Sequence, residues 1–244
     1  MSESISNVQL SLRLKMIYDM MPKSEHIWDV GTDHAFLPIY CVQTGKCKSA
    51  VASDIRRKPL ETAKRNIALN GCRDSIKTVL CAGIEDCDIE SFDTIVIAGM
   101  GGFTVREILS DRLSKENYFP GNNFFILQPN TAEHEVRKFL WDSGFTIDDE
   151  SAVRDGAHVY ACMKCHFTNQ ITPYNEIECY TGKIMPKRLS ENDRMYFEAL
   201  RVKYSNVLSG LMSRREHDSA SAERMRLCRC IVTELDRIIS LAEK

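Results

Sequence analysis

The segment from Trp28 to Pro38, Trp-Asp-Val-Gly-Thr-Asp-His-Ala-Phe-Leu-Pro, constrains the fold of this 244-residue chain more than any other. An apolar run leads to an acid, one glycine and then polar residues that begin a helix, the order of a strand, a tight turn and a helix N-terminus. Such a turn brings backbone N–H groups against a ligand. A second apolar run ends at Asp54, 23 residues after Gly31, where nucleotide-binding βαβ units hold a ribose hydroxyl. The spacing predicts a βαβ unit that binds an adenosine-containing cofactor.

The composition of this turn favours one class of cofactor. A dinucleotide site favours Gly-x-Gly-x-x-Gly, because a pyrophosphate lies against bare backbone, whereas this turn holds one glycine between two acids. An acidic turn suits a cofactor with an amino acid tail and a cationic centre, and S-adenosylmethionine (SAM) has both. We therefore expect Asp29 and Asp33 to serve its α-amino group and sulfonium. The alternative for a lone Asp-x-Gly is a helix-starting turn with a capping acid.

After a leading helix in residues 1–22, strands and helices are predicted to alternate. Strands are expected over residues 26–30, 49–54, 75–81, 92–98, 123–128, 145–154 and 157–167, the last two joined by an Asp-Gly hairpin turn. Helices are expected over residues 35–43, 59–70, 102–109 and 131–141, the last capped by Thr131. The pattern predicts an α/β protein with a doubly wound, seven-stranded sheet, the Rossmann-like fold of SAM-dependent methyltransferases. Ligands of such sheets lie at the carboxyl ends of the strands, where Asp29, Asp54, Gly99 and Gln128 fall.

Residues 184–244 form a second predicted unit after a domain at 1–183. Apolar residues step by three and four along two segments, Phe197–Leu211 and Cys228–Ala242, which predicts an antiparallel coiled-coil hairpin. This tail holds 12 Lys and Arg against 9 Asp and Glu, a balance of +3, whereas the rest holds 20 against 25, a balance of −5. A locally basic surface serves nucleic acid, but it is also typical of an ordinary solvated helix face.

Several classes of protein are excluded by composition. No apolar run reaches the length of about 20 residues that a membrane span needs, and the N-terminus lacks the pattern of a signal peptide. We therefore expect a cytoplasmic protein whose ten cysteines are reduced. Cys162-Met-Lys-Cys165-His matches a haem attachment pattern, but it lies in a predicted strand. Zinc would need a second ligand pair, so no metal is expected.

Four segments together resemble one family. They are Asp29–Pro38, Ile97-Ala-Gly-Met-Gly-Gly102, Leu127-Gln-Pro-Asn130 and the start Leu10-Ser-Leu-Arg-Leu14. They are similar to those of the bacterial tRNA (adenine-22)-N1-methyltransferases, and the resemblance covers essentially the whole chain. It implies an enzyme that transfers a methyl group from SAM to N1 of adenine 22 in the D-arm of tRNA and leaves S-adenosylhomocysteine (SAH). The coiled coil also offers a route to self-association.

The resemblance and the strand-end positions imply three groups of site residues. Those expected at the cofactor are Asp29, Gly31, Asp33, His34, Asp54, Ile55, Ala82, Gly83, Ile84, Ala98, Gly99 and Met100. Those expected in catalysis are Asp33, His34 and Asn130. Those expected at the substrate are Gln128, Pro129 and Asn130 at the base and Lys187, Arg188, Arg201, Lys203, Arg214 and Arg215 along tRNA phosphates.

Some of these assignments leave alternatives open. His34 is equally well explained by a structural hydrogen bond, Asn130 by a helix N-cap, and Phe36 is expected mainly in the core. The family usually carries Gly-Asp-Gly after the third strand, where this chain has Cys81-Ala-Gly-Ile84. Ala82 cannot accept a hydrogen bond from the adenine amino group, so Glu85, Asp86 or backbone contacts would replace it. The other candidate functions are methylation of another RNA or a small molecule, RNA binding without catalysis, and a self-associating scaffold.

Overall fold

A seven-stranded sheet forms the centre of the computed structural model, which describes residues 8–84, 92–114, 123–214 and 218–241. The strand order is β3-β2-β1-β4-β5-β7-β6, with β7 antiparallel to both of its neighbours. The strands are β1 (His26–Val30), β2 (Ser49–Asp54), β3 (Ile76–Leu80), β4 (Thr94–Gly101), β5 (Phe124–Thr131), β6 (Phe145–Asp155) and β7 (His158–Phe167). The predicted fold is therefore confirmed.

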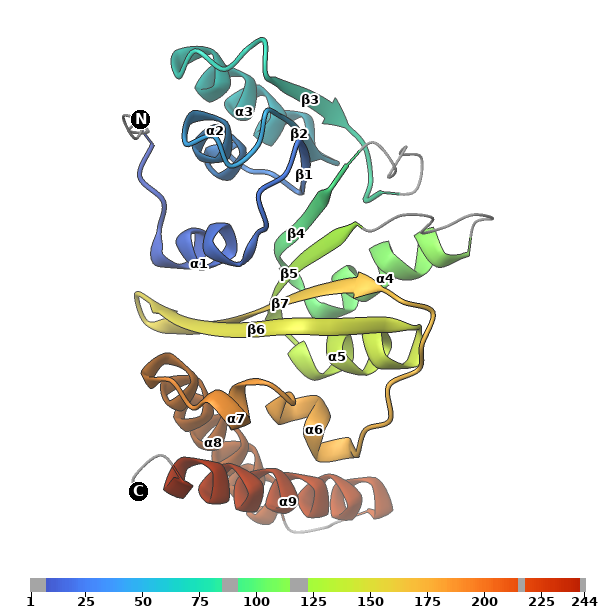
Figure 1. Ribbon diagram of the computed structural model, residues 1–244. Coiled ribbons are helices and arrows are strands. Elements are labelled where there is room, and N and C mark those ends of the chain that lie inside the picture. The colour runs from blue at the N-terminus through green and yellow to red at the C-terminus, as the bar shows by residue number, and fades with distance from the viewer. Residues whose placement is uncertain (1–7, 85–91, 115–122, 215–217, 242–244) are drawn as a thin grey trace.

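Helices cover both faces of the sheet and extend beyond its β6 edge (Figure 1). Those of the first part are α1 (Leu12–Met20), α2 (Phe36–Gln43), α3 (Arg57–Leu69), α4 (Gly102–Leu113) and α5 (Glu133–Asp142). Those of the last part are α6 (Glu176–Thr181), α7 (Met185–Arg188), α8 (Glu191–Met212) and α9 (Ser219–Leu241). Two apolar clusters, one on each face, bury strands β1, β4 and β5, as the near-continuous apolar runs of a parallel sheet require.

The carboxyl ends of the parallel strands meet at one edge of the sheet, beside α1 and the β6–β7 turn. Strands β4 and β5 run further toward this edge than expected and stay paired up to Gly101 and Thr131. Gln128 to Asn130 therefore lie within a strand. The expected cap at Thr131 is wrong, because helix α5 begins at Glu133 after Ala132, whose φ of +55° is left-handed.

The predicted tail helices are present as α8 and α9. Their apolar faces pack on each other and on the small residues Ala152 and Ala161 of β6 and β7. A buried ion pair also joins the tail region to the sheet: Arg137 of α5 donates to Glu150 of β6 over 2.6 Å. The other oxygen of Glu150 accepts from the backbone of Lys183 and Ile184. The boundary expected at 183/184 thus cuts between two residues that hold the same carboxylate.

Three other expectations concern the cysteines, a membrane-spanning helix and a metal site. Cys162 and Cys165 are fully buried in β7, and burial raises the pKa of both thiols. In the described part of the chain, no helix is long and apolar enough to span a bilayer. A cluster of three or more His, Cys, Asp or Glu side chains suited to a metal is likewise absent from those residues.

Candidate active site

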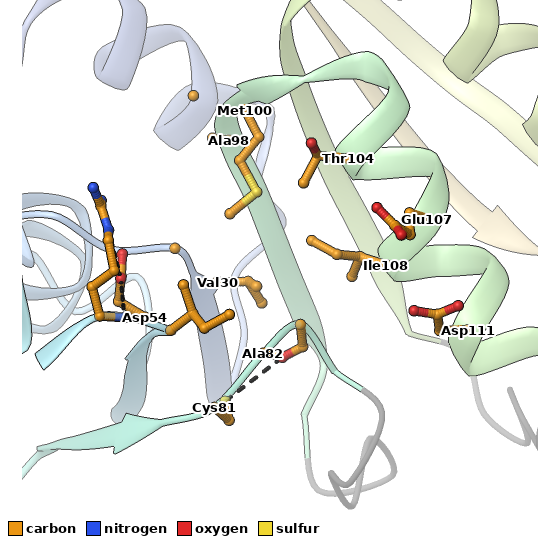
Figure 2. A pocket seen from close by; sticks show the side chains of 15 residues that line it. Val30, Asp54, Cys81, Ala82, Ala98, Met100, Thr104, Glu107, Ile108 and Asp111 are labelled. Atoms are coloured by element: carbon orange, nitrogen blue, oxygen red, sulfur yellow. Dashed lines mark hydrogen bonds and ion pairs between the residues drawn. The ribbon is translucent and has the colours of Figure 1, made fainter.

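Two adjoining pockets open at the carboxyl edge of the sheet. The larger, of about 510 Å³, lies between the ends of β2 and β3 on one side and helix α4 on the other (Figure 2). The smaller, of about 320 Å³, lies between the β1–α2 loop and helix α1. Gly31, Arg56, Ala98 and Gly99 line both. Together they form an elongated site, in the size range of small-molecule sites.

The β1–α2 loop takes the tight turn that its sequence predicts. Gly31 has a φ of +76°, and Ala35, at the start of α2, has a φ of +56°. The Thr32 N–H donates to Ser53 O of β2 over 2.7 Å, and the Thr32 hydroxyl accepts from the Ala35 N–H. The loop is therefore fixed at both ends, and its first residues face the smaller pocket.

Asp29 is the buried acid of the smaller pocket, with 8% of its surface exposed. Burial raises its pKa to about 6, against the lowering effects of the Thr32 hydrogen bond and the positive charge of Arg13. A carboxylate held in this way is costly to leave without a cationic partner. It is therefore suited to an ammonium group of a ligand.

Asp54, the last residue of β2, is the buried acid of the larger pocket, with 4% of its surface exposed. Its Oδ1 accepts from the backbone N–H of Arg56 over 2.7 Å and from Arg56 Nε over 3.3 Å. Within the described residues, each hydrogen bond found to this carboxylate goes to Oδ1. Oδ2 is thus available for a ligand hydroxyl.

Met100 lines the larger pocket. Figure 2 shows its side chain projecting between the Asp54 side and helix α4. A Cβ placed on Gly31 would lie 2.0 Å from Met100 Cε, and the left-handed φ of Gly31 also disfavours a side chain. Gly99 has a φ of +78°. Glycine at these two positions lets the chain approach a ligand from both β1 and β4.

A chain of side-chain hydrogen bonds crosses the site edge between β4, β5 and α1. The Asn130 amide donates to Gly99 O over 2.7 Å, and Gln128 Nε2 donates to Asn130 Oδ1 over 3.1 Å. Arg13 Nη1 donates to Gln128 Oε1 over 2.6 Å. The interpretation of Asn130 as a helix N-cap is therefore wrong, because its side chain links two strands instead.

Asp33, His34 and Phe36 lie at the mouth of the smaller pocket. His34 Nε2 is 3.1 Å from Asp33 Oδ2, and its ring stacks on Phe36 with centroids 5.2 Å apart. Phe36 is 37% exposed, so the expectation of core packing is wrong for this residue. The pair presents an aromatic surface next to the site.

Most residues expected at the cofactor line one of the two pockets. The exception is Ile84, whose side chain is fully buried in the core and faces neither. Gln128 and Asn130 lie at the edge through the hydrogen bonds above. Glu85 and Asp86 lie outside the described residues.

Sequence reasoning missed Arg56, which lines both pockets, and two groups of lining residues. One face of α4 supplies Thr104, Glu107, Ile108 and Asp111, and their spacing of three, one and three was a readable helical stripe. The other group is Arg13 and Leu14 of α1, for which the chain gives no local signal that this helix reaches the site.

The expected tRNA-contacting cations are divided by the structure. Lys187, Lys203 and Arg214 are exposed. Arg188 and Arg201 are exposed as well, but both are paired: Arg188 donates to both oxygens of Asp193 and to Glu150 O, and Arg201 pairs with Asp236. Arg215 lies outside the described residues.

Comparisons with known proteins place this geometry in context. A family profile described as "Methyltransferase domain" matches residues 10–163. The chain is 28% identical over 193 residues, 79% of this chain and 80% of the relative, to the tRNA (adenine(22)-N(1))-methyltransferase of Bacillus subtilis. Among solved structures, M. capricolum TrmK with bound SAH is 27% identical with a TM-score of 0.79, covering 94% of this chain and 99% of that one. A Streptococcus pneumoniae protein described as a putative tRNA (m1A22) methyltransferase, solved with SAM, is 25% identical with a TM-score of 0.79, covering 95% and 100%.

Proposed function

Since the chain belongs to the methyltransferase domain family, we propose that it transfers a methyl group from SAM to N1 of adenine 22 in tRNA. One observation carries the proposal. Two joined pockets, each with its own buried acid, lie at the carboxyl edge of the sheet. The chain matches the tRNA (adenine(22)-N(1))-methyltransferase of Bacillus subtilis over 79% of its length and the SAH-bound M. capricolum TrmK over 94%. The resemblance inferred from the motifs is confirmed by these relatives, and the enzyme is a SAM-dependent methyltransferase.

The residues of the two pockets fit SAM. Asp54, with Oδ2 available, would hold the ribose hydroxyls in the larger pocket. Asp29 would hold the α-ammonium group in the smaller pocket. The ammonium group would give the buried carboxylate a cationic partner that stabilises its ionised form. Gly31 and Gly99 permit the close approach between them. Met100 would pack against the cofactor in the larger pocket.

The adenine end of the larger pocket lacks the acid expected after β3. Ala82 lies there, and the carboxylates of Glu107 and Asp111 line the same pocket from α4 (Figure 2). A carboxylate accepts hydrogen bonds from an amino group. Glu107 and Asp111 are therefore further candidates, beside Glu85, Asp86 and the backbone, to accept a hydrogen bond from the adenine amino group.

The chemistry needs little acid–base help from the protein. SAM supplies an electrophilic methyl group, and adenine N1 carries a lone pair without first losing a proton. The contribution of the chain is therefore alignment and exclusion of water. Asn130 and Gln128 fix the edge next to Gly99, while Asp33 and His34 border the entrance. A carboxylate such as Asp33 also favours the positive charge that the methylated base acquires.

The target adenine must leave its stack to reach this edge, because N1 lies on the Watson–Crick face. The stacked rings of His34 and Phe36 offer a surface for it at the entrance. The exposed cations of the tail, Lys187, Lys203 and Arg214, would contact phosphates of the same tRNA.

The test is incubation of an unmodified tRNA transcript with radiolabelled SAM, followed by mapping of the modified nucleotide. We expect one methyl group at N1 of adenine 22, and none in a matched transcript with guanine at that position. Methylation of both transcripts would overturn the assigned nucleotide. Absence of transfer to any tRNA, with SAM bound, would instead favour a small-molecule substrate or a non-catalytic RNA-binding role.

A further inference from the structure

The smaller pocket carries two opposite charges. Asp29, which is buried, and Arg13 of helix α1 both line it. The two side chains are close enough for the charge of Arg13 to lower the pKa of Asp29. An α-amino acid group is a zwitterion, so a pocket with one carboxylate and one guanidinium complements both of its ends.

Arg13 is held in place but has free donors. Its Nη1 donates to Gln128 Oε1 and lies 3.4 Å from the position that a Cβ on Gly99 would take. Its guanidinium also lies 5.6 Å from the centre of the Tyr160 ring. No carboxylate in the described ranges lies within ion-pair distance of this guanidinium, which has five N–H donors in all.

The second cation of the pocket is already engaged. Arg56 lines the smaller pocket too, but its Nε and its backbone N–H both donate to Asp54. Its side chain is 70% exposed. Arg13 is therefore the better partner for an anionic group inside the pocket.

The β6–β7 turn fixes the helix that carries Arg13. Asp155 Oδ2 accepts from the Arg13 backbone N–H over 3.1 Å, and a hydrogen bond from the Ser11 side chain helps to hold the pKa of Asp155 low. Ser11 also caps helix α1. A turn remote in sequence thus determines where the guanidinium lies.

We propose that Arg13 binds the α-carboxylate of SAM, opposite Asp29 at the α-ammonium. The proposal rests on the proposed function and extends it, because it gives the leading helix a part in cofactor binding. The guanidinium forms charge-assisted and bidentate hydrogen bonds with a carboxylate.

The test compares two ligands in calorimetric titrations. SAH carries the amino acid tail, whereas 5′-methylthioadenosine has the same adenosine and sulfur without it. We expect Arg13→Gln to weaken SAH about 10- to 100-fold, the effect of losing a charged hydrogen bond, and to leave 5′-methylthioadenosine unchanged. Arg13→Lys keeps the charge and should restore part of the SAH affinity. The matched control is Lys15→Gln, which removes a cation of the same helix that pairs with Asp19 and should change neither ligand.

Each other outcome is decisive. Equal weakening of both ligands by Arg13→Gln would mean that Arg13 only supports the pocket and would overturn the inference. Unchanged SAH affinity with a raised KM for tRNA would assign Arg13 to an RNA phosphate and overturn it as well. If the wild-type chain bound SAH and the variant bound it equally, the inference alone would fail. If the wild-type chain did not bind SAH, the proposed function would fail.

Discussion

At the scale of single residues, the site contains a buried carboxyl whose ionisation lowers the stability of the free protein. Asp29 is buried, and burial raises its pKa from 3.8 to about 6. Such an arrangement destabilises the ionised form and marks a functional position more often than a structural one. The conformation of Gly31 is also unusual, because its φ of +76° is left-handed and strains any residue that has a side chain.

The raised pKa of Asp29 predicts that Asp29→Asn stabilises the fold and weakens cofactor binding. The folded state binds the proton of this carboxyl more tightly than the unfolded state, so its ionisation lowers stability as pH rises from about 4 to 6. Above pH 6 the cost is about 3 kcal/mol. Asp29→Asn should therefore raise the melting temperature at pH 8, lose this advantage near pH 4, and weaken SAH at least tenfold. A variant that melts below the wild type at pH 8 would contradict this account.

Asp54 should affect binding with little change in the fold. Asp54→Asn keeps an oxygen for the Arg56 backbone N–H but loses the charged acceptor for the ribose hydroxyls. Charge-assisted hydrogen bonds of this kind contribute about 1.5–3 kcal/mol, so the dissociation constant for SAH should rise by one to two orders of magnitude in calorimetry. An unchanged constant would remove Asp54 from the ribose contact.

At the scale of elements, one buried ion pair connects α5 and β6 to α6 and the segment after it. Arg137 and Glu150 have side chains 0% and 1% exposed, and Arg137 also donates to the carbonyls of Cys179 and Tyr180. The Glu150 charge raises the pKa of Arg137 even though burial lowers it. Gly182 is required beside them, because a Cβ there would lie 2.4 Å from Glu150 Oε2.

Breaking this pair should cost far more than breaking a surface pair. Glu150→Gln leaves the Arg137 charge buried without a partner, and such changes cost about 3–5 kcal/mol. The exposed pair Lys64–Glu61 is the matched control, where Glu61→Gln should cost less than about 0.5 kcal/mol. Urea denaturation of both variants measures the difference. Similar losses of unfolding free energy in the two variants would show that the buried pair contributes no more to stability than the exposed pair.

At the scale of the whole molecule, the tail packs directly against the sheet. Helix α8 packs on β6, and the backbone after α6 completes the partners of Glu150. Deletion of residues 184–244 would therefore expose a buried charge as well as remove cations. Surface substitutions test the role of the tail in tRNA binding without that complication.

The exposed tail cations should govern affinity for tRNA and not for the cofactor. A triple variant with Lys187, Lys203 and Arg214 changed to Gln should raise the KM for tRNA and leave SAH affinity and melting temperature unchanged. It should also flatten the dependence of log K on log salt by about two to three units. The control with the same charge change replaces the exposed Lys23, Lys48 and Lys64. Equal effects of the two triple variants would remove the tail from the tRNA contact.

Local sequence patterns determined the elements and their order. Strands β1 and β2 begin and end where the apolar runs predict, because a buried parallel strand needs apolar side chains on both faces. The turn at Gly31 and the acids at Asp29 and Asp54 were also predictable, since the carboxyl ends of neighbouring parallel strands meet at one edge. The lengths of β4 and β5 were not, because their last residues, Gly-Met-Gly and Gln-Pro-Asn-Thr, break the apolar runs and are held by pairing with each other.

The tertiary structure alone decided which distant residues share the site. Arg13 lines the smaller pocket through partners far away in the sequence: its backbone donates to Asp155, 142 residues away, and its side chain donates to Gln128, 115 residues away. Arg188 and Arg201 look like free cations in the sequence, yet in the fold Arg188 pairs with Asp149 of β6 and Arg201 pairs with Asp236 of α9. A residue's neighbours along the chain fix its backbone conformation and its face, whereas its partners across the fold depend on packing between elements, which no local pattern contains.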